Sequence, residues 1–186
     1  MQVADYTIRD YRPDCWLDVT GILVKSSNIG VAKLALDIGA DPLHAMLTRA
    51  GFGQRSGTGL GGESPGIVLP SERWGPVETA NIAFGQGIAV TPLQLAAAVS
   101  VLANQDLYVQ PRLVETDLDA SQKSGARVMD AAVARQVMSM LEYATSADGT
   151  GSKAVPAGYR VAGKTGTAQK PDARGRYSEG KYTAVF

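Results

Sequence analysis

The longest apolar run of the chain covers residues 93–103 and is interrupted only by Gln94 and Ser100. Thr91-Pro92 stands directly before it, and a capping residue followed by proline is a common way for a helix to begin. The run is far shorter than the roughly 18 residues that a membrane-spanning helix needs. It therefore predicts a core helix that ends near Asn104. A chain of 186 residues, 45% of them hydrophobic, is large enough to bury such a helix.

Helical and extended patterns alternate along the rest of the sequence. Helical spacing of apolar residues predicts further helices over residues 29–36, 41–51, 77–84 and 131–144, with Asp41 and Asp130 as caps and Val133, Val137, Met138 and Leu141 facing inward. Extended segments are expected over residues 6–11, 107–114, 158–162 and 182–186. A loop rich in Gly, Ser and Pro covers residues 53–76. These elements predict a mixed α and β domain.

Charge and composition exclude several kinds of site. The 18 basic and 18 acidic residues give a net charge of zero, which argues against a nucleic-acid partner. Cys15 is the only cysteine and His44 the only histidine, so an internal disulfide framework and a Cys- or His-rich metal site are excluded. We expect no cofactor. Residues 1–6 do not resemble a signal peptide, so an export or anchoring element of a longer protein would lie upstream.

Two short motifs contain residue types that can support catalysis. Ser26-Ser27-Asn28 stands before a predicted helix, where it could equally be an N-cap. Lys164-Thr165-Gly166-Thr167 follows a predicted strand, where the glycine could simply allow the close approach of a neighbour. The glycines of residues 57–62 do not form a phosphate-binding loop, because neither a leading strand nor a following Gly-Lys-Ser/Thr is present.

The order and spacing of these motifs are similar to those of a known family. Ser-x-Asn and Lys-Thr-Gly are two of the three motifs of penicillin-binding proteins and β-lactamases. Residues 24–31, 84–96 and 158–168 extend the match, so that nearly the whole chain resembles the class B, division-type penicillin-binding transpeptidases. The resemblance implies an α/β fold, an antiparallel sheet packed with helices, with a helical subdomain. It also implies that residues 1–186 are a partial domain, truncated at both ends.

The resemblance also assigns roles to individual residues. Ser26, Asn28 and Lys164 are the expected catalytic residues: Ser26 relays a proton, Asn28 holds the substrate backbone, and Lys164 supplies a cation. The expected substrate-binding residues belong to the Lys-Thr-Gly-Thr segment and are Thr165, Gly166 and Thr167. The two threonines offer hydroxyls to the substrate carboxylate, and the glycine lets the substrate lie along the strand as an added strand would.

The third motif of the family, Ser-x-x-Lys, provides the nucleophile and lies upstream of Ser-x-Asn. Residues 1–25 contain no serine. The spacing occurs once, at residues 178–181, but there it follows Lys-Thr-Gly in a predicted loop, where Ser and Lys would not stand one helical turn apart. We therefore expect this chain alone to be inactive.

The implied function is that of a serine D,D-transpeptidase of septal cell-wall synthesis. Its expected partners are the D-Ala-D-Ala stem peptide of peptidoglycan, β-lactam antibiotics, which acylate it, and division proteins. Its expected location is the periplasmic face of the bacterial inner membrane. A β-lactamase or a β-lactam-sensing domain on the same fold is the alternative.

Overall fold

The computed structural model describes residues 1–12, 14–114, 125–172 and 177–186, with the side chains of residues 171 and 177–179 left aside. The chain forms two compact units. One consists of Met1–Asp37, Pro76–Gly87 and Ser139–Phe186, and the other of Ile38–Gly75 and Ile88–Met138. Both predicted motifs lie in the first unit. No helix in the described ranges is both long enough and apolar enough to span a membrane.

The first unit begins with a small hairpin and two consecutive helices. Strand β1 (Gln2–Val3) pairs antiparallel with β2 (Tyr6–Thr7). Helix α1 (Val19–Lys25) leads almost directly into α2 (Asn28–Ile38), and α4 (Pro76–Ala83) joins the same unit. Val3, Ile8, Ala32 and Ala80 are buried together, so the hairpin segment, α2 and α4 share one core.

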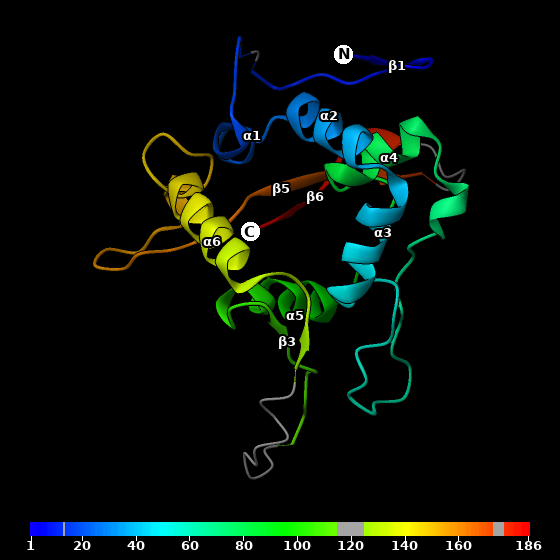
Figure 1. Ribbon diagram of the computed structural model, residues 1–186, viewed down its shortest axis with the longest axis vertical. Coiled ribbons are helices and arrows are strands. Elements are labelled where there is room, and N and C mark those ends of the chain that lie inside the picture. The colour runs from blue at the N-terminus through cyan, green and yellow to red at the C-terminus, as the bar shows by residue number, and fades with distance from the viewer. Residues whose placement is uncertain (13, 115–124, 173–176) are drawn as a thin grey trace. The chain divides into compact units, whose positions relative to one another are not determined.

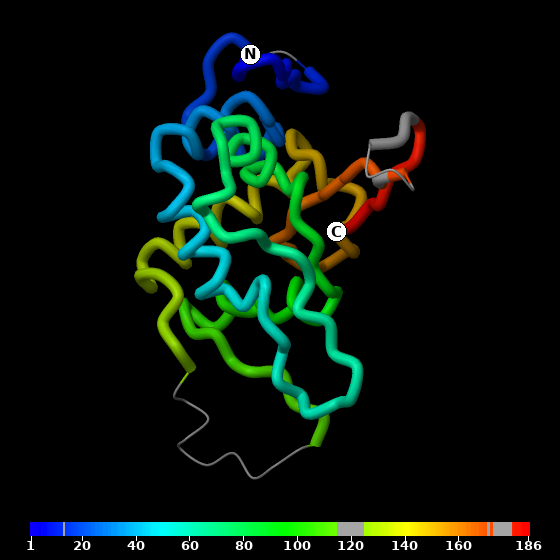
Figure 2. The backbone as a smooth tube through the Cα atoms, turned by 90° about the vertical axis from the view of Figure 1, so that its right-hand side faces the viewer, coloured from blue at the N-terminus to red at the C-terminus, as the bar shows by residue number. Residues whose placement is uncertain are grey.

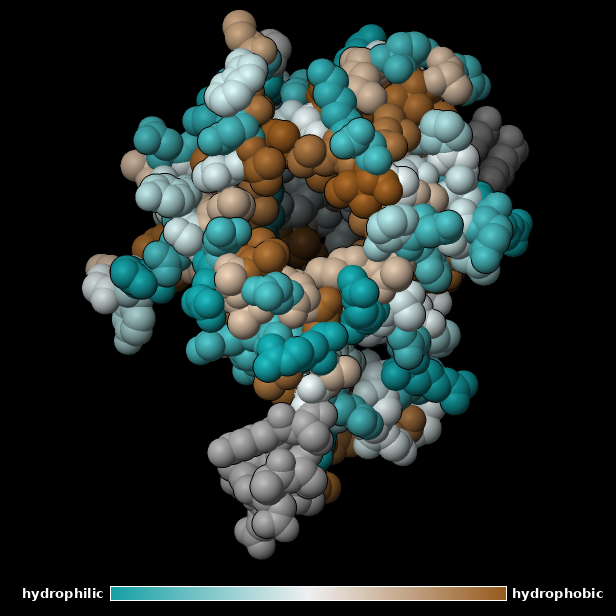
Figure 3. All heavy atoms as spheres, viewed as in Figure 1, coloured by the Kyte–Doolittle hydropathy of each residue, from teal (hydrophilic) through white to brown (hydrophobic). Residues whose placement is uncertain are grey.

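A two-stranded ribbon completes the first unit. Strand β5 (Gly166–Pro171) runs antiparallel to β6 (Tyr177–Val185), with Gly166 opposite Val185 and Thr167 opposite Ala184. The two strands lie side by side in both backbone views (Figures 1 and 2). Apolar side chains also reach the molecular surface, as the brown spheres in Figure 3 show. Among the exposed large side chains are Tyr182 and Val185 on β6 and Phe186 directly after it, which are 51%, 47% and 58% exposed.

The second unit is mainly helical. It contains α3 (Ala40–Arg49), a 3-10 turn (Ser71–Arg73) and α5 (Pro92–Ala103), followed by a short antiparallel pair, β3 (Leu107–Tyr108) with β4 (Ala126–Arg127). Helix α6 (Ala131–Ala144) begins in this unit, and its last turns belong to the first unit. The loop after residue 53, turquoise in Figure 2, is fixed at Ile67, which bridges to Ala89.

Gln94 fixes the same loop from within helix α5. It closes a capping box with Thr91 at the start of the helix. Its side chain is only 1% exposed, and Nε2 donates to the backbone carbonyls of Gln54 and Pro65 at 2.7 and 2.9 Å. Gln94, a polar residue within the apolar run, is thus buried, and its hydrogen-bond partners are carbonyl groups of the loop that it holds.

Each predicted helix is present, but the structure corrects some local predictions. Helix α3 has Gly39 as its N-cap, and Asp41 lies within its first turn. On α6, Val137, Met138 and Leu141 are half-buried as predicted, on the same side as the fully buried Ala134, but Val133 is 46% exposed and does not face inward. Residues 158–162 form no strand, because the segment is held by the end of α6 and not by a neighbouring strand.

Candidate functional site

The short link between α1 and α2 gives Ser26 and Ser27 opposite environments. Ser26 is the C-cap of α1 and has left-handed backbone angles, φ 58° and ψ 47°, which cost energy in any residue with a Cβ. Ser26 is exposed, while Ser27 is only 6% exposed. The Ser27 hydroxyl accepts from the backbone N–H of Gly30 at 2.9 Å, as an N-cap does. Capping is therefore the task of Ser27, which leaves the Ser26 hydroxyl available for other contacts.

The side chain of Lys164 contacts the Ser26 hydroxyl. Its ammonium donates to the Ser26 hydroxyl at 2.8 Å and to the backbone carbonyl of Thr165 at 2.9 Å. Partial burial removes water from the ammonium and lowers its pKa below the usual value of 10.5. The sequence prediction placed the two motifs at one site, and this hydrogen bond brings Ser26 and Lys164 together within the first unit.

A turn at residues 145–151 is bonded to the Lys-Thr-Gly motif and to Lys25, the residue before the Ser-Ser-Asn motif. The Thr165 hydroxyl donates to the Thr150 hydroxyl at 3.0 Å, and the ammonium of Lys25 donates to the Asp148 carbonyl at 3.2 Å. The turn is tight at Gly149, where an added Cβ would lie 2.1 Å from the carbonyl oxygen of Ala144. No motif in the sequence marked Thr150.

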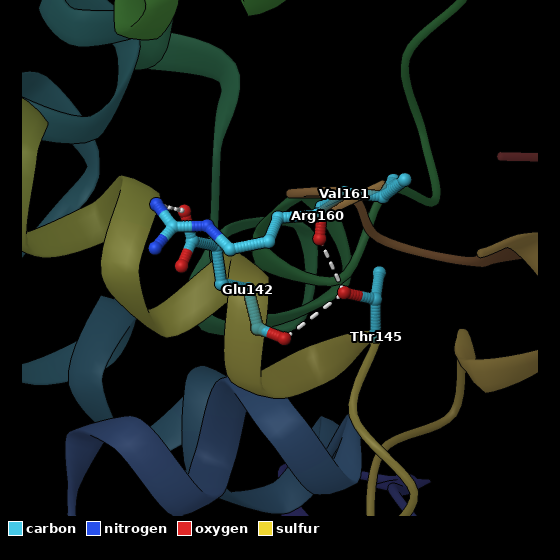
Figure 4. Close-up of polar contacts among 4 residues, drawn as sticks. All are labelled: Glu142, Thr145, Arg160 and Val161. Atoms are coloured by element: carbon cyan, nitrogen blue, oxygen red, sulfur yellow. Dashed lines mark hydrogen bonds and ion pairs between the residues drawn. The ribbon is translucent and has the colours of Figure 1, made fainter. Parts of the chain in front are cut away.

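The approach to Lys164 is held by the end of α6 (Figure 4). The buried Thr145 hydroxyl lies within hydrogen-bonding distance of the Val161 carbonyl and of the Glu142 carbonyl. Arg160 forms an exposed ion pair with Glu142 at 3.2 Å. Because these contacts come from a helix end, the segment before Lys164 is fixed without belonging to a sheet.

The other predicted site residues occupy distinct positions. Gly166 and Thr167 are the first residues of β5, and Thr167 is exposed. A Cβ on Gly166 would lie 2.9 Å from Val185 on β6, so the glycine has a packing reason beside its predicted substrate role. The Asn28 amide donates to the Arg9 carbonyl at 3.3 Å.

Neither a helical Ser-x-x-Lys site nor a metal centre is found in the part of the chain that the structure describes. The backbone of residues 178–181 belongs to β6, so the predicted loop is wrong, but the conclusion that Ser178 and Lys181 are not set on a helical turn is confirmed. No three His, Cys, Asp or Glu side chains in the described ranges gather as a ligand set.

Comparison with known proteins decides the family. The profile described as "Penicillin binding protein transpeptidase domain" matches residues 1–186. The chain belongs to the penicillin-binding protein transpeptidase family. This confirms the predicted resemblance and the fold class that it implied.

Two curated relatives of this transpeptidase domain match over nearly its whole length. The probable peptidoglycan D,D-transpeptidase PbpC of Pseudomonas aeruginosa is 38% identical over 186 residues, which are 100% of this chain and 32% of the relative. The peptidoglycan D,D-transpeptidase FtsI of Escherichia coli K12 is 37% identical over 183 residues, 98% of this chain and 30% of the relative. The chain thus spans about a third of the length of these relatives.

Solved structures agree with the sequence relatives. The transpeptidase domain of Burkholderia pseudomallei penicillin-binding protein 3 superposes with a TM-score of 0.84 at 38% identity, over 90% of this chain and 50% of that one. Penicillin-binding protein 3 of Mycobacterium tuberculosis, complexed with ampicillin, gives a TM-score of 0.78 at 34% identity, over 89% of this chain and 40% of that one. The β-lactamase or sensing alternative is not favoured, because the curated relatives are named transpeptidases.

Proposed function

We propose that these residues are part of a serine D,D-transpeptidase that cross-links peptidoglycan stem peptides and is acylated by β-lactams. The observation that carries the proposal is the hydrogen bond from Lys164 to Ser26, which joins the two motifs at one point. The names of the relatives and the ampicillin complex of a structural neighbour support it.

Acyl transfer from a D-Ala-D-Ala peptide needs an attacking serine, a route for a proton to the leaving nitrogen, and donors for the oxyanion. In this proposal Ser26 passes the proton, and Lys164 keeps the hydroxyl oriented and supplies positive charge. Thr165 and Thr167 bind the substrate carboxylate, and Asn28 holds the substrate backbone. The Thr167 N–H is one oxyanion donor, and Gly166 allows the substrate to lie along β5.

The attacking serine is proposed to lie in polypeptide outside these residues. Ser26 is committed to Lys164, and residues 1–25 contain no serine. The longer protein would act outside the cytoplasm, at the periplasmic face of the inner membrane. A role in septal synthesis with division proteins is part of the proposal, and it rests on the resemblance of residues 24–31, 84–96 and 158–168 to the division-type transpeptidases.

Labelling with a fluorescent penicillin tests this function. The full-length protein should form a stable adduct on a serine upstream of Ser26. The 186-residue chain alone should remain unlabelled. Ser26→Ala and Lys164→Ala should each slow labelling by about 100-fold or more, because proton transfer and charge stabilisation are lost. Ser139→Ala and Lys153→Ala, on exposed residues outside the site, are the matched controls.

Three results would contradict the proposal. One is a folded full-length protein that takes up no label. Another is rapid hydrolysis of the bound label, which would indicate a β-lactamase. The third is a stable adduct on any residue of the isolated chain.

A further inference from the structure

Asp10 contacts the Ser-Ser-Asn link from a segment that the sequence motifs do not include. Its two carboxylate oxygens have separate partners: the Ser27 hydroxyl donates to Oδ2 at 2.7 Å, and the backbone N–H of Ile29 donates to Oδ1 at 2.9 Å. The carboxylate therefore spans the first turn of α2, where a negative charge is favoured by the helix dipole.

These bonds belong to a closed network. Ser27, which donates to Asp10, also accepts from the N–H of Gly30, so one hydroxyl and two helix N–H groups are satisfied together. The neighbouring carbonyl of Arg9 accepts from the Asn28 amide at 3.3 Å. Two adjacent residues, 9 and 10, thus hold three consecutive residues, 27 to 29, of the link and the helix start.

Ser26 is held by α1 and by this network together: the Ser27 N–H donates to the Ile22 carbonyl of α1 at 3.0 Å, and the Ser27 hydroxyl donates to Asp10. The left-handed backbone of Ser26 is strained, and strained residues keep their conformation only where the surrounding structure imposes it. The end of α1 fixes one side of Ser26, and the bound Ser27 fixes the other. Release of the Ser27 side chain would remove the second of these supports.

We propose that Asp10 is a positioning residue: through Ser27 and the first turn of α2, it holds the Ser26 hydroxyl against Lys164. This inference rests on the proposed transpeptidase function. It assigns to Asp10 a part in the acylation rate without any contact with substrate.

The experiment measures β-lactam acylation of the full-length protein by stopped-flow, with rates referred to the folded fraction. Asp10→Ala is expected to lower the acylation rate constant at saturating β-lactam by about 10- to 100-fold, because small displacements of a reacting group have effects of this size. The dissociation constant of the non-covalent complex should change little. Asp10→Asn keeps an oxygen for the Ile29 N–H but puts an NH2 group where the Ser27 hydroxyl finds its acceptor, so it should recover part of the rate.

Asp130→Ala is the matched control. Asp130 accepts from the N–H of Ala132 at 2.6 Å, so this variant also removes an aspartate that caps a helix, but one without a contact to either motif. It should lose stability and keep the wild-type acylation rate. Ser27→Ala removes the hydroxyl that donates to Asp10, and so disrupts the same network. If Asp10→Ala does not fold, the rate of Ser27→Ala provides the test.

The outcomes separate the two proposals. A wild-type protein that is not acylated contradicts the proposed function itself. If the wild type is acylated, wild-type rates in folded Asp10→Ala or Ser27→Ala overturn the role of Asp10. An Asp10→Asn variant slower than Asp10→Ala would also overturn it, because the retained bond to the Ile29 N–H would then not help to hold the link.

Discussion

The ammonium of Lys164 lies 2.8 Å from the hydroxyl oxygen of Ser26, although 138 positions of the chain separate the two residues. Ser26 is held in a strained left-handed conformation, and Lys164 is partly removed from water. Both conditions cost stability, so the contact is maintained by the structure around it and not by the preferences of the two residues. Substitutions at this pair should therefore separate stability from activity.

Ser26→Gly and Ser26→Ala should differ in stability and agree in activity. Both variants lose the hydroxyl, so both should be acylated at the same low rate. Glycine adopts the left-handed C-cap freely and alanine does not, so Ser26→Gly should be the more stable by about 1 kcal/mol. Urea denaturation gives the two free energies of unfolding, and equal values would show that residue 26 is not strained.

The acylation rate should fall as the pH rises through the pKa of Lys164. Because burial lowers this pKa, the fall should occur at a pH below 10.5. The positive charge near Ser26 and the substrate carboxylate is lost when the ammonium deprotonates. Lys164→Arg should move this basic limb of the pH–rate profile upward, because a guanidinium stays protonated throughout. A limb at an unchanged pH in Lys164→Arg would assign it to another group.

Stability should depend on pH in the opposite direction through the same residue. Between the lowered pKa of Lys164 and pH 10.5, the unfolded chain binds more protons than the folded one. The free energy of unfolding should therefore increase as the pH rises through this range. Lys164→Met removes the titrating group, and its stability profile should lack that gain relative to the wild type.

Gly149→Ala should disturb the turn over residues 145–151, which is bonded to Thr165 and to Lys25. The new Cβ would lie 2.1 Å from the Ala144 carbonyl oxygen, so the backbone has to shift and the Thr150–Thr165 hydrogen bond is lost. We expect a loss of about 1–3 kcal/mol in stability and slower acylation. Gly61→Ala is the control, since a Cβ at residue 61 would have no atom within 4 Å, and it should match the wild type in both measurements.

The sequence predicted the helices better than the contacts between them. Thr91-Pro92 and Asp130 predicted the starts of α5 and α6, because capping is a local interaction. Tertiary packing decided what local patterns could not. The segment over residues 158–162 has the composition of a strand, yet contacts from the end of α6 determine its conformation.

The same distinction applies to the candidate site. Ser26 and Lys164 were predicted because they belong to motifs, and the structure brings them into contact. Asp10 and Thr150 were missed, because a single Asp or Thr in a loop has no spacing that marks it. Their roles depend on bonds to Ser27 and Thr165, which only the folded chain reveals.

Gln94→Leu should destabilise the second unit although it makes the long apolar run of α5 still more apolar. The leucine would leave the carbonyls of Gln54 and Pro65 and the N–H of Thr91 without the hydrogen bonds that the Gln94 side chain provides. Unsatisfied buried groups of this kind cost about 1–3 kcal/mol each, and partial access of water reduces the sum, so we expect a loss of about 2–4 kcal/mol in urea denaturation.

Ser100→Ala, at the other polar position of the run, is the matched control for Gln94→Leu. The Ser100 hydroxyl donates to the Ala97 carbonyl within its own helix, so its removal should change stability by less than about 0.5 kcal/mol. If the two variants were equally stable, the Gln94 side chain would not be what holds the loop. A large loss in Gln94→Leu alone would show that a buried amide, and not the hydrophobicity of α5, fixes the loop over residues 54–65 to the helix.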